Sequence, residues 1–205
     1  MPSPTLSHAG YLLAGGKSSR MGENKAFIDF RGQTLLDRAL ATLRAACGSV
    51  TIVGDPQTFF SYHPVVPDLF PGSGPLAGIH TALTHSSTEL NLLLAVDMPF
   101  VRPELLRFLL QKAEDGAHAS TAFVTIPQTS RGLQPLCAIY RRAFAPVAEK
   151  AMRSGNYKID ATFGDIPIHV IAEQQLAAAG FSEKDFFNVN TPDDRRSADR
   201  LSRSQ

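Results

Sequence analysis

Cysteine is scarce in this sequence, and its scarcity excludes two classes of protein. Only two cysteines occur among the 205 residues, Cys47 and Cys137, and they stand far apart within apolar stretches. A disulfide framework or a thiolate metal site would need more cysteines at closer spacings. We therefore expect both cysteines to be packing residues in a reducing compartment.

The sequence also lacks an excess of charge and a long apolar run. With 20 basic and 19 acidic residues the formal net charge is +1, which gives no overall attraction to nucleic acid or to membrane lipid. The longest apolar run, 92–96, is far too short to span a bilayer, and residues 1–7 lack the features of a secretory signal. We expect a cytoplasmic protein that binds neither nucleic acid nor membrane.

Alternation of apolar segments predicts an α/β fold. Apolar runs of strand length alternate with longer segments of helical periodicity, which is typical of β-α-β units and a mainly parallel sheet. The expected strands are 10–14, 50–54, 90–96, 119–125, 136–140 and 166–171. The expected helices are 34–46, 76–84, 103–113, 141–152 and 192–201. We predict a single-domain, Rossmann-like three-layer sandwich with a mainly parallel, mixed central sheet over residues 8–201, and flexible tails at 1–7 and 202–205.

A glycine-rich loop directly follows the first expected strand. Residues 13–25 read LAGGKSSRMGENK, and their three glycines let the backbone approach a ligand so that successive N–H groups line an anion site. Arg20 and Lys25 add cationic donors for phosphate oxygens. The spacing matches neither a dinucleotide fingerprint, a P-loop nor a nucleophile elbow. We interpret the loop as a phosphate cradle rather than as a solvated turn with surface lysines.

An aspartate ends the most apolar expected strand. Asp97 directly follows the run 92–96, where α/β sheets place their ligands. Mg²⁺ binds one or two carboxylates together with substrate phosphate oxygens, so Asp97 is the candidate metal ligand. The alternative is an aspartate that caps or turns the chain before the helix expected at Pro103. The neighbouring phosphate cradle favours the metal.

Two further segments combine turn signals with polar side chains. In 67–79, glycines and Pro75 shape a loop at a helix start, where free N–H groups favour an anion or a base edge, and Asp68 could accept from an amine or a ribose hydroxyl. Taken alone, this segment is more typical of an ordinary turn. Asn188 and Asn190 would point to the same side of a strand and present amides, whereas the following Thr-Pro pair is typical of helix initiation.

Five segments resemble, in the same order, the motifs of the molybdenum cofactor guanylyltransferases of the nucleotidyltransferase superfamily. They are LAGGKSSRMGENKA, PDLFPGSGPLAGI, LLLAVDMPF, GLQPLCAIYRR and FFNVNTPDD, and the resemblance extends from about Gly10 to about Arg200. It implies a nucleotide-diphospho-sugar transferase-like fold. It also implies that Mg²⁺-dependent transfer of GMP from GTP to the terminal phosphate of molybdopterin forms the guanine dinucleotide cofactor and releases pyrophosphate. Proteins that deliver molybdopterin or mature molybdoenzymes would be partners.

The resemblance assigns roles to particular residues. Nucleotide binding is implied for Leu13, Ala14, Gly15, Gly16, Lys25, Asp68, Pro75, Leu76, Gly78 and Asp97. Catalysis is implied for Lys25, Arg20 and Asp97, with Asp97 as the metal ligand, and acceptor binding for Lys158, Asn188 and Asn190. The pair 15–16 and the segment 75–78 favour GTP over CTP. One departure is Gly54, which stands where family members can carry an asparagine that contacts the nucleotide.

Two alternatives keep the same fold. One is a cytidylyl- or sugar-phosphate nucleotidyltransferase, since base selectivity depends on hydrogen-bond geometry that a sequence does not display. The other is a non-catalytic module that senses a nucleotide. The presence of both Lys25 and Asp97 counts against the second alternative.

Overall fold

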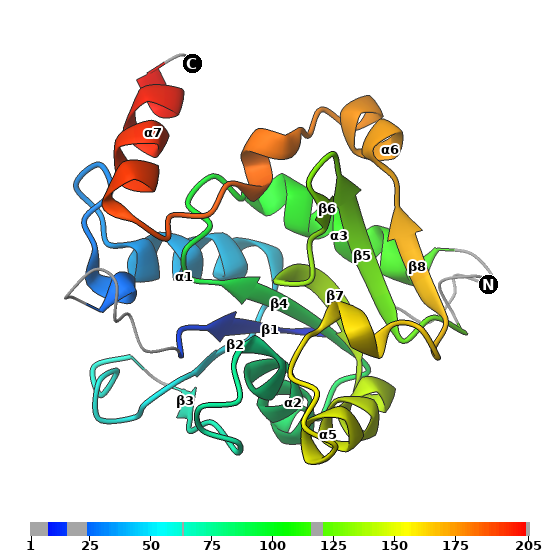
Figure 1. Cartoon of the computed structure of the whole chain (residues 1–205). Helices are drawn as coiled ribbons and strands as arrows, with labels where there is room; N and C mark the ends of the chain where they lie inside the picture. Colours follow the sequence, from blue (N-terminus) through cyan, green and yellow to red (C-terminus); the bar gives the residue numbers. More distant parts are fainter. Residues whose placement is uncertain (1–7, 16–23, 63, 116–120, 204–205) are drawn as a thin grey trace.

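A mixed β-sheet forms the centre of the chain (Figure 1). The computed structural model describes residues 8–15, 24–62, 64–115 and 121–203. Strand order is β3-β2-β1-β4-β7-β5-β6, and β8 pairs with β5. The strands are β1 (His8–Leu13), β2 (Val50–Val53), β3 (Val65–Val66), β4 (Leu90–Ala95), β5 (Val124–Thr129), β6 (Gly132–Leu133), β7 (Cys137–Arg141) and β8 (Ile168–Ile171).

Strand direction makes this sheet mainly parallel. β1 pairs in parallel with both β2 and β4, and β8 pairs in parallel with β5, whereas β7 is antiparallel to both β4 and β5. Leu12 stands opposite Leu94, so the carboxyl ends of β1 and β4 lie at the same edge of the sheet. The expected α/β fold with a mainly parallel, mixed sheet is confirmed.

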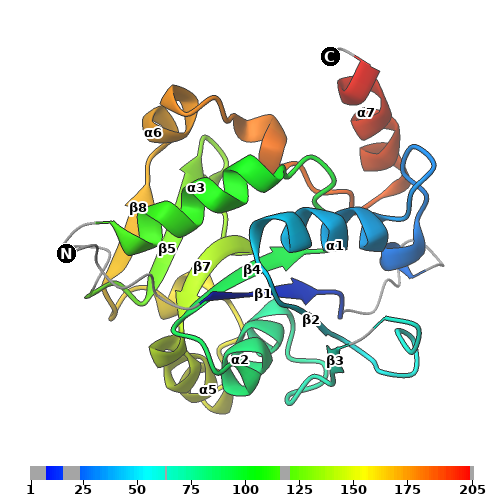
Figure 2. The same cartoon turned by 180° about the vertical axis from the view of Figure 1, so that it is seen from behind.

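Helices cover both faces of the sheet (Figures 1 and 2). One face is covered by α1 (Leu35–Ala46) and α3 (Pro103–Glu114), and the other by α2 (Pro75–His85) and α5 (Ala145–Arg153). The short α6 (Glu173–Ala178) follows β8, and α7 (Pro192–Arg203) ends the described chain. None of the helices within the described ranges is long and apolar enough to cross a bilayer.

Strand β4 is buried on both faces, which explains why its sequence is apolar from Leu92 to its end. Leu92 and Leu94 pack into the core beneath α1 and α3, together with Leu105. Leu93 points the other way and packs into the core beneath α2 and α5, together with Ala148. This alternation follows from the two-residue period of a strand.

Some boundaries differ from the expected ones. The strand expected at 119–125 is displaced, because β5 begins at Val124 and ends at Thr129; residues 116–120 lie outside the described part of the chain. Pro127 lacks an N–H donor but still bonds through its carbonyl, which accepts from Gln134 N (2.8 Å). The helix expected from Arg141 begins instead as a 3₁₀ turn (Arg142–Phe144) before α5. Strands β3 and β6 and helix α6 are too short to give a periodic signal.

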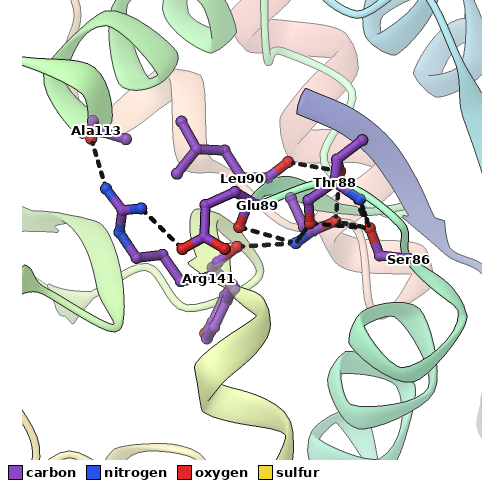
Figure 3. A network of polar contacts seen from close by, with 8 residues as sticks. Ser86, Thr88, Glu89, Leu90, Ala113 and Arg141 are labelled. Atoms are coloured by element: carbon purple, nitrogen blue, oxygen red, sulfur yellow. Dashed lines mark hydrogen bonds and ion pairs between the residues drawn. The ribbon is translucent and has the colours of Figure 1, made fainter. Parts of the chain in front are cut away.

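A polar network holds the beginning of β4 beside β7 (Figure 3). Asn91 is fully buried, its Nδ2 donates to the Tyr140 carbonyl (3.2 Å), and its Oδ1 accepts from Ser86 Oγ (2.5 Å). Arg141 Nη1 donates to Glu89 Oε1 across the same strand pair (2.9 Å). Because the buried Asn91 and Ser86 side chains are paired, a shift of register would leave them unsatisfied. The network therefore helps to fix the register of β4 against β7.

Candidate functional site

The site lies at the sheet edge where β1 and β4 end. Val96 N donates to the Leu13 carbonyl (3.1 Å), and Ala14 N donates to the Val53 carbonyl (3.0 Å). These bonds extend the parallel pairing one residue past each strand. Gly15 and Asp97 therefore leave the sheet side by side, at the carboxyl ends where open α/β sheets bind ligands.

Three side chains that are distant in sequence meet at this edge. Lys25 Nζ donates to Asn190 Oδ1 (2.5 Å) and lies 3.5 Å from Asp97 Oδ2. Val189 N donates to the Asp97 carbonyl (2.8 Å), so the segment before α7 is attached to the end of β4. A cationic donor, a carboxylate and an amide thus face one another.

Local structure determines where Lys25 points. It is the first residue of a one-turn 3₁₀ helix (Lys25–Phe27), and Asn24 Oδ1 caps this turn by accepting from Ala26 N (3.1 Å). Ala26 is fully buried, and Ile28 accepts from Leu35 N at the start of α1 (3.0 Å). Anchoring on both sides leaves the lysine side chain directed toward Asp97.

Asp97 has the properties of a ligand for a hard cation. Its side chain is only 17% exposed, and its Oδ1 is buried with no hydrogen-bond partner among the described residues. Burial raises the pKa of the Asp97 carboxyl, and the neighbouring Lys25 opposes this by lowering it. Of the alternative roles of Asp97, the helix cap is wrong because the cap of α3 is Arg102, whereas the turn is confirmed because Asp97 lies in the turn that follows β4.

The surroundings of Asp97 limit how a cation would be held. In the parts of the chain that the structure describes, no group of three or more His, Cys, Asp or Glu side chains could hold a metal ion. Within the described ranges, a cation at Asp97 would therefore find at most two such side chains, which suits an ion that also binds substrate phosphate oxygens. Mg²⁺ is commonly bound in this way.

The glycine loop is described only at its two ends. Leu13 and Ala14 have buried side chains, so only their main-chain groups could face a nucleotide. Gly16 and Arg20 lie outside the described residues.

Asp68 is held in a turn beside α2. Its Oδ1 accepts from Phe70 N (3.0 Å) and from Thr81 Oγ1 (3.2 Å), and Leu69 N donates to the same threonine oxygen (3.0 Å). This is the ordinary turn that the sequence favoured for the segment taken alone. A nucleotide contact by Asp68 remains a prediction.

The start of α2 contains the other residues expected to contact the nucleotide. Gly74 has a φ of +73°, which leads into Pro75 at the beginning of the helix. Leu76 is fully buried and offers only its backbone. A Cβ atom on Gly78 would lie 3.3 Å from Leu13 Cδ2, so glycine lets α2 pack tightly on β1. Packing alone accounts for Leu76 and Gly78.

The departure at Gly54 has a packing reason. A Cβ atom there would lie 2.7 Å from Cε2 of Phe59, a ring that is 1% exposed. The Phe59 ring also packs against Phe27, with centroids 5.8 Å apart. The space that a side chain at position 54 would need is therefore filled by Phe59.

Gly54→Ala should destabilise the fold. Because the buried Phe59 ring has to shift, we expect the free energy of unfolding to fall by about 1–3 kcal/mol, measured by urea denaturation. Gly48→Ala is the matched control, since a Cβ atom at Gly48 meets nothing within 4 Å. Equal urea midpoints for the two variants would contradict the packing role of Phe59.

A cavity of about 420 Å³ adjoins the three side chains that meet at the sheet edge. Two of the residues that line the cavity connect it with those side chains. Asn190 accepts from Lys25, and Met98 directly follows Asp97. Its apolar lining consists of Met98, Leu133, Pro135, Leu136, Phe186 and Phe187. Its polar lining consists of Arg131, Gln134, Glu183, Asn188, Asn190 and Asp194.

The segment that carries the two asparagines is not a strand, so the expected strand there is wrong. Its backbone groups bond elsewhere: Val189 N to the Asp97 carbonyl and Asn190 N to Asp194 Oδ2 (3.0 Å). Asn188 and Asn190 nevertheless line the same cavity. The helix initiation expected at Thr191 is confirmed, because Thr191 Oγ1 accepts from Asp194 N (3.1 Å).

Comparison with known proteins identifies the family. Residues 10–179 match the model of the MobA-like NTP transferase domain. The chain is 34% identical over 191 residues to a probable molybdenum cofactor guanylyltransferase of Pelotomaculum thermopropionicum, covering 92% of this chain and 90% of the relative. It is 32% identical over 193 residues to a molybdenum cofactor guanylyltransferase of Desulfosudis oleivorans, covering 93% of each. The chain belongs to the molybdenum cofactor guanylyltransferase family.

A solved structure agrees with this assignment. The molybdopterin-guanine dinucleotide biosynthesis protein A of Archaeoglobus fulgidus is 28% identical, with a TM-score of 0.83 over 96% of this chain and 100% of that chain. The family resemblance and the nucleotide-diphospho-sugar transferase-like fold predicted from the motifs are confirmed. As a member of the guanylyltransferase family, the chain is a nucleotidyltransferase.

In this member of the guanylyltransferase family, the expected acceptor residues do not all lie at the cavity. Lys158 is exposed in the segment after α5, and it is not among the described residues that line the cavity. Conversely, no sequence pattern selects Arg131 or Glu183, because each is a single charge outside the recognised motifs. Residues 133–136 of the cavity lining belong to the fourth motif, which is the sequence signal for that side of the cavity.

Proposed function

We propose that this chain transfers GMP from GTP to the terminal phosphate of molybdopterin and releases pyrophosphate. The observation that carries the proposal is the 3.5 Å approach of Lys25 Nζ to Asp97 Oδ2, beside a cavity that contains Asn190. A lysine and a carboxylate at one point suit a triphosphate with a bound cation, and the adjoining cavity suits the acceptor. The names of the relatives support GTP and molybdopterin as the substrates.

The Asp97 carboxylate fits a divalent cation such as Mg²⁺. The fit rests on the buried Asp97 Oδ1, which no described hydrogen-bond donor reaches. A divalent cation bound there would supply charge neutralisation to the phosphate oxygens of the nucleotide. The Lys25 ammonium is positive and the Asp97 carboxylate is negative. The first can therefore bind the phosphate oxygens of a triphosphate while the second binds its cation.

The residues of the chain would act mainly by positioning and electrostatics. An oxygen of the acceptor phosphate attacks the α-phosphorus of GTP, and the bond to the departing pyrophosphate breaks. Lys25 Nζ donates to phosphate oxygens and stabilises the charge that develops on them, and Arg20 is proposed to do the same. The main-chain N–H groups of Gly15 and Gly16 are proposed to direct the triphosphate. A general base is unnecessary because the attacking phosphate is already ionised.

The acceptor would occupy the 420 Å³ cavity. Asn188 and Asn190 offer amide groups to its polar edges, and the apolar side chains provide the surface on which a planar ring system packs. The contribution of Lys158 stays a prediction that depends on the family resemblance. Delivery of molybdopterin by a partner protein is likewise proposed from that resemblance.

Nucleotide selectivity can be tested by thermal unfolding. With Mg²⁺ and GTP at about a hundredfold above its Kd, binding stabilises the native state by about 3 kcal/mol, which raises Tm by roughly 5–10 °C for a protein of this size. CTP, ATP and UTP at the same concentration should raise Tm much less. A larger shift with CTP would favour a cytidylyltransferase. Pyrophosphate release on adding molybdopterin separates an enzyme from a nucleotide sensor.

A further inference from the structure

The charges around the cavity are unevenly distributed. Arg131 is the sole basic residue among the described residues that line it, whereas Glu183 and Asp194 are acidic. The carboxylate of Asp194 is engaged at the start of α7, where its Oδ2 accepts from Asn190 N (3.0 Å) and Thr191 N (2.9 Å). Glu183 therefore is the carboxylate that faces Arg131.

Arg131 and Glu183 form an ion pair at the edge of the cavity. Arg131 Nε lies 2.5 Å from Glu183 Oε1, and Ser130 Oγ donates to the other carboxylate oxygen of Glu183. The pair joins the turn between β5 and β6 to the 3₁₀ helix before the asparagine segment (Glu183–Phe186). In Figure 1 these two segments lie together on one side of the sheet.

The turn that carries Arg131 has a defined backbone. Gly132 has a φ of +104°, a conformation that favours glycine, and Gln134 N donates to the Pro127 carbonyl (2.8 Å). Gln134 Nε2 also donates to Thr129 Oγ1 (3.1 Å) and to the Gly132 carbonyl (3.2 Å). The guanidinium is therefore presented from a fixed turn rather than from a loose loop.

The exposure of this ion pair allows a ligand to replace Glu183 as the partner of Arg131. The side chain of Arg131 is 68% exposed and that of Glu183 is 35% exposed, and ion pairs so exposed contribute little to stability. An anionic group within the cavity would offer the guanidinium a charge-assisted hydrogen bond in more apolar surroundings. Such a group would therefore compete with Glu183 for the guanidinium.

We propose that Arg131 is an acceptor-binding residue that pairs with a negatively charged group of the acceptor other than its attacking phosphate. Glu183 is a positioning residue that holds the guanidinium at the cavity and competes with the acceptor for it. The inference rests on the proposed function, because it assumes that the cavity holds the acceptor. It assigns to the β5–β6 turn a role in recognising the acceptor rather than the nucleotide.

Steady-state kinetics of the full chain with Mg²⁺, GTP and molybdopterin tests the inference. Arg131→Ala should raise KM for molybdopterin about tenfold, as expected for loss of one charge-assisted contact, with kcat and KM for GTP unchanged. Arg131→Lys should restore part of the affinity. Glu183→Gln keeps a hydrogen-bonding side chain but removes the competing charge, so it should lower KM for molybdopterin.

The chain offers a matched control in Arg153. This arginine is 69% exposed and pairs with Glu149 on α5, which covers the other face of the sheet, so Arg153→Ala should leave KM for molybdopterin unchanged. An unchanged KM for molybdopterin in Arg131→Ala, or a rise in KM for GTP instead, would overturn the role of Arg131 while the proposed function stands. If the unaltered chain transferred no GMP to molybdopterin, both would be overturned.

Discussion

Asp97→Ala is expected to reduce GMP transfer by at least about a thousandfold, because the variant loses the carboxylate that fits the cation. The fold should remain intact, since the lost Oδ1 has no hydrogen-bond partner among the residues described. Asp97→Asn, which keeps the size of the side chain but not its charge, should be nearly as inactive. The measurement is pyrophosphate release with GTP, Mg²⁺ and molybdopterin, accompanied by urea denaturation to check folding.

A second measurement separates cation binding from turnover. Titration with Mn²⁺ in the presence of GTP, followed by electron paramagnetic resonance, should show weakened metal binding in Asp97→Ala. Asp193→Ala is the control, because Asp193 is an exposed aspartate at the start of α7 that pairs with Arg196. Transfer at the unaltered rate by Asp97→Ala with Mg²⁺ present would show that the assignment of Asp97 is wrong.

Lys25→Ala is expected to lower kcat/KM by about a hundredfold to a thousandfold, the loss typical when a donor to developing phosphate charge is removed. Lys25→Arg should recover little, because the planar guanidinium is larger and cannot replace an ammonium that lies 2.5 Å from Asn190 Oδ1 and 3.5 Å from Asp97. The measurement is the initial rate of pyrophosphate release over a range of GTP concentrations.

Lys150→Ala provides the comparison for Lys25, since Lys150 is an exposed lysine on α5. It should retain the full rate. If Lys25→Ala and Lys150→Ala had equal rates, Lys25 would have no part in the reaction. The interpretation of the glycine-rich loop as a phosphate cradle would then be wrong.

The part of the fold that the sequence predicted best is its parallel half. Strand β4 is buried on both faces, and residues 92–96 therefore form an unbroken apolar run that Asp97 visibly ends. Once β1 and β4 are recognised as parallel strands, their carboxyl ends must share an edge. This is why Lys25 and Asp97 could be assigned to one pocket before their separation was known.

The mixed half of the sheet was predicted less well. Strand β5 continues through Pro127, which sequence reasoning treats as an end signal, and β6 is a two-residue strand set by the turn at Gly132. The contact between Lys25 and Asn190 joins residues 165 positions apart, so it depends on the path of the whole chain. The role of Phe59 beside Gly54 is similarly a matter of three-dimensional packing.

The attachment of Val189 to Asp97 also separates the surroundings of Lys25 from the pairing of the strands. Every strand of the described sheet ends by Ile171, so Asn190 lies on a segment that follows the last strand and reaches the sheet edge through the bond from Val189 N to the Asp97 carbonyl. A substitution in residues 188–190 can therefore change what Lys25 contacts without breaking any strand pair of the described sheet.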